Sequence, residues 1–168
     1  EALVGNLTVS SAIDLDGTAS STLQLKAGGN LVLNQSIEDL ATGSPELTNI
    51  YLQSNSNTTM LDGVKVDSSG GILSIVSTAS LSVGQLVSDG GPMFFFVGGS
   101  VTDAGDTGTY DIDTGGGTAS FTVSGDIGGT SYATALEVSD SLFDFTFSNA
   151  NSNVYLDAGL STADLVIS

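Results

Sequence analysis

The segment TLQLKAGGNLVLNQSI, residues 22–37, overlays the segment ILSIVSTASLSVGQLV, residues 72–87, without a gap at a shift of 50 residues. A second overlay places NLTVSSAI, residues 6–13, on NLVLNQSI, residues 30–37, at a shift of 24 residues. In both overlays apolar residues alternate with polar ones, which is the period of a β-strand that buries one face. The chain therefore contains an internal repeat built from short strands.

The repeat has an apolar skeleton, in which a second apolar residue follows two positions after the first and a third follows four positions later. Copies that begin at Leu7, Leu31, Thr58 and Leu81 are spaced by 24, 27 and 23 residues. Periods of about 20–50 residues are typical of solenoids, in which each repeat buries its apolar face by stacking on its neighbours. The spacing predicts an all-β fold, a right-handed parallel β-solenoid, with Leu7, Leu31 and Leu81 stacked in one row.

The second half of the chain fits this repeat less regularly. Further matches of the skeleton begin at Phe95, Phe121, Leu136 and Val154, with uneven spacing, and ten of the eleven aromatic residues lie in this half. We expect a single β domain over residues 1–168, with an internal change of packing near residues 89–92. The alternative fold is an antiparallel β-sandwich or jelly roll, because its hairpins alternate with the same period of two.

The charge of the chain is strongly negative. Asp and Glu number 19 against two basic residues, which gives a formal net charge of −17. Nucleic-acid binding depends on clustered basic residues that release counterions from phosphates, so the composition argues against a nucleic-acid partner. Because 40% of the residues are hydrophobic, the chain has enough apolar surface to form a core. We interpret the acidic residues as a solvated surface that keeps a β protein soluble.

The sequence predicts no transmembrane segment. Its longest uninterrupted apolar run, residues 93–97, is far shorter than the roughly 20 residues of a membrane-spanning helix. The chain also begins without Met and shows no signal-peptide pattern at Glu1, which we interpret as a processed mature chain or an excised fragment.

The residue types needed for most enzyme chemistry are missing. Without His, Cys or Arg, nucleophilic triads, zinc sites and phosphate clamps cannot be assembled, and we expect that the protein is not an enzyme. The remote alternative is a β-helix enzyme that acts on polysaccharides. Its paired carboxylates would be Asp111 with Asp113, or Asp14 with Asp16.

Calcium binding is a better explanation for the acidic residues than catalysis, because this ion takes hard oxygen ligands from carboxylates and carbonyls. No cofactor is required by the sequence. Two acidic segments supply the candidate calcium ligands, which are Asp14, Asp16, Asp103, Asp106, Asp111 and Asp113.

Residues 5–87 resemble the β-helical repeats of filamentous-haemagglutinin-like exoproteins and large bacterial adhesins. The segments that carry the resemblance are GNLTVSSAI, LQLKAGGNLVLNQSI and LSIVSTASLSVGQLV, with a Gly-Gly-Asn turn at residues 28–30. Gly and Asn tolerate the left-handed backbone of a tight corner, and Asn side chains at equivalent corners are candidates for a hydrogen-bonded ladder. The resemblance implies secretion, surface display and an adhesive or scaffolding role.

We therefore expect an extracellular module of a cell-surface adhesin or filament, which self-associates into a homo-oligomer or filament through strand edges or ends. A glycan or a host-cell surface is the candidate ligand. The alternative function is a pilin-like subunit that polymerises by donor-strand complementation.

The segment around Phe95 has aromatic side chains on both faces of one predicted strand, which predicts burial on both sides. Contact with a neighbouring subunit is the alternative explanation. Strand-like residues near both ends of the chain are also candidates for contact with a neighbouring subunit, by strand addition to its sheet. The candidate interface residues are Phe94, Phe95, Phe96, Leu3, Val4, Leu165 and Val166.

Overall fold

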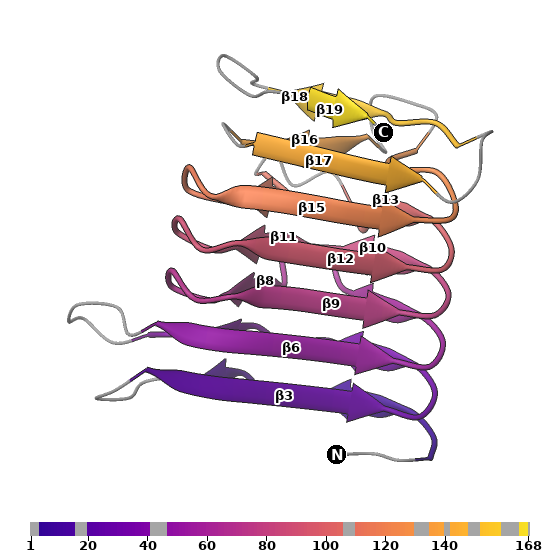
Figure 1. The fold of residues 1–168 in the computed structure, drawn as a ribbon. Helices are drawn as coiled ribbons and strands as arrows, with labels where there is room; N and C mark the ends of the chain where they lie inside the picture. The colour runs from indigo at the N-terminus through magenta and orange to yellow at the C-terminus, as the bar shows by residue number, and fades with distance from the viewer. Residues whose placement is uncertain are drawn as a thin grey trace.

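The computed structural model describes residues 4–15, 20–40, 47–105, 110–129, 135–139, 142–147, 152–158 and 165–167. Within these residues the regular structure consists of strands, which form three sheets in which each strand pairing is parallel. Figure 1 shows the windings stacked along one axis in a right-handed coil, from indigo at the bottom to yellow at the top. The predicted parallel β-solenoid is thus confirmed, and the parallel pairing excludes the antiparallel sandwich.

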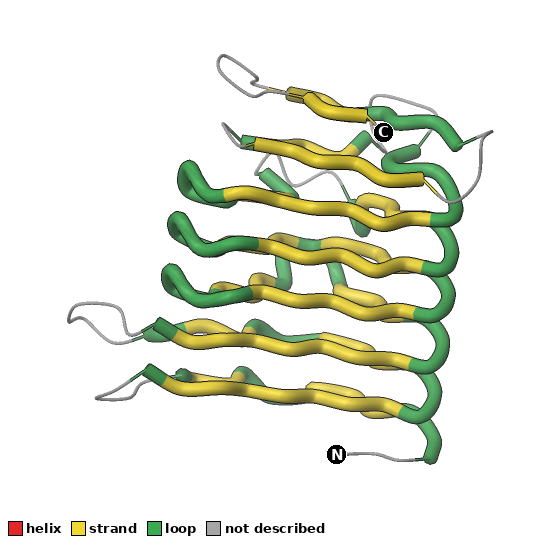
Figure 2. The backbone as a smooth tube through the Cα atoms, in the orientation of Figure 1, coloured by secondary structure: helices red, strands yellow, loops and turns green. Residues whose placement is uncertain are grey.

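Each sheet takes strands from successive windings, and short loops join the sheets at the corners (Figure 2). Sheet A contains β3 (Ser21–Ala27), β6 (Thr48–Ser54), β9 (Leu73–Ser77), β12 (Met93–Val97), β15 (Thr118–Val123), β17 (Leu142–Phe147) and β19 (Leu165–Ile167). Sheet B contains β1 (Leu7–Val9), β4 (Leu31–Leu33), β7 (Thr58–Met60), β10 (Leu81–Val83) and β13 (Val101–Asp103). Sheet C contains β2 (Ile13–Asp14), β5 (Ile37–Glu38), β8 (Lys65–Asp67), β11 (Gln85–Val87), β14 (Ile112–Asp113), β16 (Leu136–Val138) and β18 (Leu156–Ala158).

The register of sheet B confirms the predicted row of apolar residues. Leu7 pairs with Leu31, Leu31 pairs with Thr58, and Thr58 pairs with Leu81. Neighbouring strands lie about 4.8 Å apart, so equivalent side chains stack directly on one another. Leu31, Thr58 and Leu81 have relative exposures of 0%. The stacked windings thus bury the face that a single winding would leave in water.

The register that we predicted for the second half is wrong at three of its four starting positions, since Phe95 and Phe121 lie in sheet A and Leu136 lies in sheet C, whereas Val154 does belong to the row of Leu81. Leu81 pairs with Val101, and isolated bridges continue that row to Ile127 and Val154. We had aligned Phe95 with the row of Leu81, although Phe95 lies in sheet A. An apolar residue followed two positions later by another occurs in all three sheets, so the skeleton does not tell which sheet a match belongs to. The strands on both sides of residues 89–92 belong to the same three sheets.

A smaller register error concerns the third position of the skeleton. Ile37 pairs with Val66, and Val66 pairs with Leu86. Leu86, with a relative exposure of 0%, therefore takes the core position that we predicted for Val87. The core position of sheet C follows four residues after Leu33 but only three residues after Val83, because the connection between β10 and β11 is shorter than the one between β4 and β5.

The predicted Asn ladder is present at the corner that precedes sheet B. Asn6 Oδ1 accepts a hydrogen bond from the Asn30 backbone N–H at 2.9 Å, and Asn30 Oδ1 accepts one from the Asn57 N–H at 3.1 Å. The same contact then runs from Asn57 to Ser80, Ser100, Asp126 and Asn153, at 3.0, 3.3, 3.2 and 2.8 Å. Each side chain thus satisfies a backbone donor of the next winding.

The corner between sheets C and A is a repeated turn that sequence analysis missed. It occurs as Ser68-Ser69-Gly70-Gly71, Ser88-Asp89-Gly90-Gly91 and Thr114-Gly115-Gly116-Gly117. The two central residues have positive φ, as in a type I′ turn, and in the second copy φ is 46° at Asp89 and 94° at Gly90. The first hydroxyl donates to the carbonyl of the fourth residue at 3.0, 2.7 and 3.1 Å in the three copies. A Ser/Thr-x-Gly-Gly pattern spaced by one winding is the sequence signal for this corner.

Candidate functional site

Three acidic side chains converge beside sheet C. Asp103 ends β13, Asp111 directly precedes β14, and Glu137 lies in β16. One carboxylate oxygen of each lies within 4.8 Å of the others. The Asp111 N–H donates to the Glu137 carbonyl at 2.8 Å, and the Glu137 N–H donates to Asp111 Oδ2 at 3.0 Å. Because β14 pairs with β16, residues one winding apart in the sequence meet in one carboxylate cluster.

The carboxyl group of Asp111 is almost fully removed from water, with a relative exposure of 1%. Burial raises the pKa of Asp111 to about 9, and its hydrogen bond with the Glu137 side chain and the negative charges of Asp103 and Glu137 act in the same direction. The Glu137 backbone N–H acts in the opposite direction, because it stabilises the ionised form. We infer that Asp111 is protonated at neutral pH and donates its hydrogen bond to the Glu137 carboxylate.

This protonation makes the stability of the fold depend on pH. The pKa of Asp111 rises from about 3.9 in the unfolded chain to about 9 in the folded one. The stability that the Asp111 proton contributes is therefore complete below about pH 4. It is lost as the pH rises through the pKa of Asp111 in the folded chain. Asp111→Asn keeps a hydrogen-bond donor without the charge. We expect this variant to gain stability relative to the parent protein as the pH is raised, in urea titrations read by circular dichroism.

Asp113→Asn is the matched control, because it removes one negative charge two residues away but outside the cluster. Parallel curves of stability against pH for the parent and Asp111→Asn would contradict a buried proton at Asp111. Repeating the titrations with calcium and with a chelator tests the predicted cation, since a ligand that binds only the folded state raises its stability. A calcium effect of the same size in Asp111→Asn would mean that the ion does not depend on the Asp111 carboxylate, since the Asn side chain offers only a carbonyl oxygen in its place.

The structure brings together two of the six predicted calcium ligands, Asp103 and Asp111, and adds Glu137. Sequence reasoning missed Glu137, which lies 26 residues after Asp111, a spacing equal to that of the neighbouring windings at Val101 and Ile127. Calcium prefers about six to eight oxygen ligands. The three carboxyl groups of the cluster supply oxygen atoms as ligands. Calcium binding stays a prediction.

The remaining predicted ligands lie apart from the cluster or outside the described residues. Asp113 accepts hydrogen bonds from the Gly115 N–H at 3.0 Å and from the Ser139 hydroxyl at 2.7 Å. Its hydrogen-bond partners therefore differ from those of Asp111, the residue with which it is paired in the prediction of polysaccharide chemistry. Asp14 lies in β2 and accepts from the Leu40 N–H at 3.3 Å. Asp16 and Asp106 lie outside the described residues.

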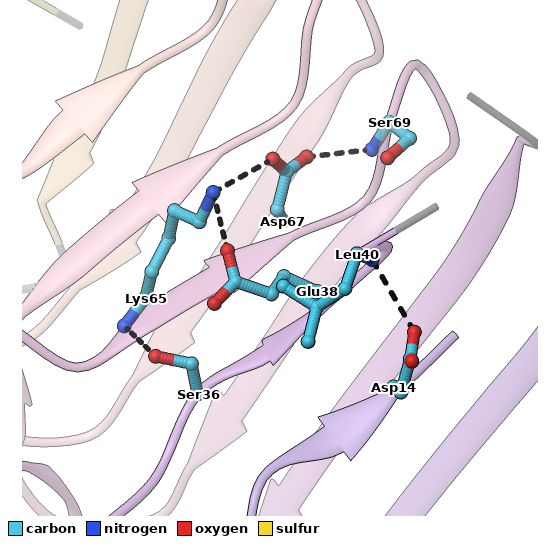
Figure 3. A network of polar contacts seen from close by, with 7 residues as sticks. All are labelled: Asp14, Ser36, Glu38, Leu40, Lys65, Asp67 and Ser69. Atoms are coloured by element: carbon cyan, nitrogen blue, oxygen red, sulfur yellow. Dashed lines mark hydrogen bonds and ion pairs between the residues drawn. The ribbon is translucent and has the colours of Figure 1, made fainter. Parts of the chain in front are cut away.

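An ion-pair network connects the earlier windings of sheet C (Figure 3). Lys65 Nζ lies 2.5 Å from Glu38 Oε2 and 3.5 Å from Asp67 Oδ2. Burial lowers the pKa of Lys65, but the hydrogen bonds and charges of Glu38 and Asp67 outweigh it and raise the pKa above its usual value. Asp67 also accepts from the Ser69 N–H at 2.8 Å, which connects the network to the glycine-rich corner. Ion pairs that are still partly exposed, as these are, contribute about 1 kcal/mol or less.

The predicted interface segment in β12 is buried on one face only. Phe95 has a relative exposure of 1% and belongs to the core, so its prediction as an interface residue is wrong. Phe94 and Phe96 have relative exposures of 36% and 48%, so our prediction of burial on both faces is also wrong. Alternation along the strand places these two rings on the outer face of sheet A.

The predicted interface residues near the ends of the chain are only partly described. Val4 has a relative exposure of 94%, and Leu3 lies outside the described residues. Leu165 and Val166 lie in β19, where they pair with Phe143 and Asp144 of β17.

No family model, no curated protein and no solved structure matches this chain significantly. No helix of the described residues is long and apolar enough to span a membrane. The class of the protein therefore follows from its fold: it is a parallel β-solenoid. The β-helix repeat that we predicted for residues 5–87 is confirmed at this level.

Proposed function

We propose that the chain is a structural module of an extracellular adhesin or surface filament, which associates with further windings through the open edge of its solenoid. The edge of the first winding carries this proposal. Within the described residues, β1, β2 and β3 each pair on one side only, with β4, β5 and β6. An unpaired strand edge is a template for strand addition.

The core at this edge is incomplete. Leu7, Ile13, Leu23 and Leu25 are only partly buried. Their equivalents one winding later have relative exposures of 0–1%, and these are Leu31, Ile37, Ile50 and Leu52. A further winding would cover these side chains and would pair the backbone groups of β3 that no described strand pairs. The partner that supplies it is a second copy of the chain or a neighbouring repeat of the same kind.

The composition supports an exterior, adhesive role for the stacked module. Its acidic surface keeps a rigid, strand-rich particle soluble, and its lack of His, Cys and Arg leaves few means of acid-base or nucleophilic catalysis. A glycan or a host-cell surface is the proposed ligand of the assembled module. The donor-strand alternative depended on a β-sandwich and gains no support from parallel sheets.

Leu23→Lys is expected to weaken end-to-end association by more than about tenfold, because docking would bury an unpaired charge in the core. Association is measured by sedimentation velocity at moderate salt, and electron micrographs show whether filaments or single particles form. Gln35→Lys adds the same charge at an exposed loop position and is expected to associate like the parent. A parent protein that stays monomeric at high concentration would overturn the proposal, as would equal association of the two variants.

A further inference from the structure

We infer that the outer face of sheet A is a lateral interface, on which a second copy of the chain docks face to face with its solenoid axis reversed. This goes beyond the proposed association at the open edge, because it concerns the side of the solenoid. The face is made by outward side chains of β3, β6, β9, β12, β15 and β17. These are Thr22, Gln24, Lys26, Asn49, Tyr51, Gln53, Ser74, Val76, Phe94, Phe96, Thr118, Ser120, Thr122, Asp144 and Thr146.

The charge of this face favours a second copy. Among the outward side chains described, Lys26 and Asp144 are the charged ones, whereas the whole chain has a net charge of −17. Two copies repel each other wherever their acidic surfaces come within about 8 Å, the screening length at physiological salt. The outer face of sheet A avoids this repulsion. By contrast, the carboxylate cluster and the Lys65 network place acidic groups along sheet C.

The two charges of the face lie at opposite ends of it, which selects the reversed orientation. Lys26 is on β3, and Asp144 is on β17. A two-fold axis that lies in the interface parallel to the strands exchanges β3 with β17. Lys26 of each copy then opposes Thr146 of the other, and Asp144 is two residues away along that strand, about 7 Å. This distance is within reach of the Lys26 side chain, and two-fold symmetry makes the pair twice.

The same axis exchanges β9 with β12 at the centre of the face. Val76 pairs in register with Phe96 within one copy, so Phe96 of each copy packs on Val76 of the other. Phe94, Phe96 and Val76 thus form an apolar centre, and Gln, Ser and Thr side chains surround it. An apolar centre with a polar rim is the usual arrangement of a protein interface.

The size of the face fits a reversible dimer. Six strands at a spacing of about 4.8 Å and a strand length of about 20 Å give a face of about 600 Å² per copy. A standard interface buries about 800 Å² per partner. We therefore expect a dimer that dissociates on dilution.

Lateral docking is tested in the full chain carrying Leu23→Lys, so that failure of the open-edge proposal and failure of this one are distinguishable. Sedimentation velocity is expected to show a monomer–dimer equilibrium, with a dissociation constant raised about tenfold or more by Phe96→Ser. Leu61→Ser is the matched control, because Leu61 has a relative exposure of 50% and lies outside sheet A. Lys26→Asp and Asp144→Lys are each expected to weaken the dimer, and the double variant is expected to restore it.

A chain that stays monomeric in this background at all concentrations would overturn the inference. Dimers that are unaffected by Phe96→Ser, or that the charge swap does not restore, would also overturn it. Binding of the monomer to an uncharged polysaccharide, lost in Phe96→Ser, would assign the face to a glycan in place of a second copy.

Discussion

Gly91→Ala is expected to destabilise the solenoid by about 3 kcal/mol or more, a large effect for the addition of one methyl group. A Cβ atom at Gly91 would lie 2.0 Å from the carbonyl oxygen of Gly71 and 2.7 Å from that of Gly70 in the preceding winding. The turn cannot move away easily, because the Gly90 N–H donates to the Thr114 carbonyl at 2.6 Å. The loss is measured as the change in the free energy of unfolding in urea.

Gly116→Ala separates this contact from backbone strain. Gly116 has a φ of 89°, and no atom lies within 4 Å of a Cβ built on it. Its replacement is therefore expected to cost only the left-handed conformation, roughly 1–2 kcal/mol. A Gly91→Ala variant that is no less stable than Gly116→Ala would mean that the windings do not approach each other closely at this corner.

The first windings could be predicted from the sequence because their loops have similar lengths. Residues 6–13 overlay residues 30–37 without a gap, so the row from Leu7 to Leu31 and the ladder from Asn6 to Asn30 followed directly. The prediction failed where loop lengths vary from one winding to the next. Phe95 and Leu81 satisfy the same alternating pattern in different sheets, and only strand pairing tells them apart.

The candidate site was only partly predictable for a related reason. Asp111 and Glu137 are far apart in the sequence and meet because one winding separates them. Knowledge of the winding length in the second half was therefore needed to find the cluster. The exposure of Phe94 and Phe96 could not be predicted for a different reason. Alternation shows that a strand has two faces, but it does not show whether a further layer covers the second face.

Phe121→Ala is expected to lower the free energy of unfolding by about 4 kcal/mol, because Phe121 is a large aromatic side chain in the core. Phe121 has a relative exposure of 1% and lies between two other rings on sheet A. Its ring centroid is 4.2 Å from that of Phe95, at an interplanar angle of 8°, and 5.0 Å from that of Phe145, at 25°. Removal of the ring leaves a cavity and ends both stacking contacts, each worth about 0.5–1.5 kcal/mol beyond the burial of area.

Phe96→Ala is the matched control, since Phe96 lies on the neighbouring strand β12 but points outward with a relative exposure of 48%. At concentrations where the chain is monomeric, it is expected to cost about 0.5 kcal/mol or less. Equal losses for the two variants would contradict a core built on stacked aromatic rings.

The loss of stability from Phe121→Ala is expected to be local, because each winding of a solenoid contacts only its neighbours. Hydrogen exchange is expected to quicken first in β12, β15 and β17, whose strands pair around Phe121. The strands β4 and β7, which pair in earlier windings, are expected to stay protected at the same denaturant concentration. A uniform increase in exchange over all these strands would instead mean that the windings unfold as one cooperative unit, and that stability passes along the whole stack.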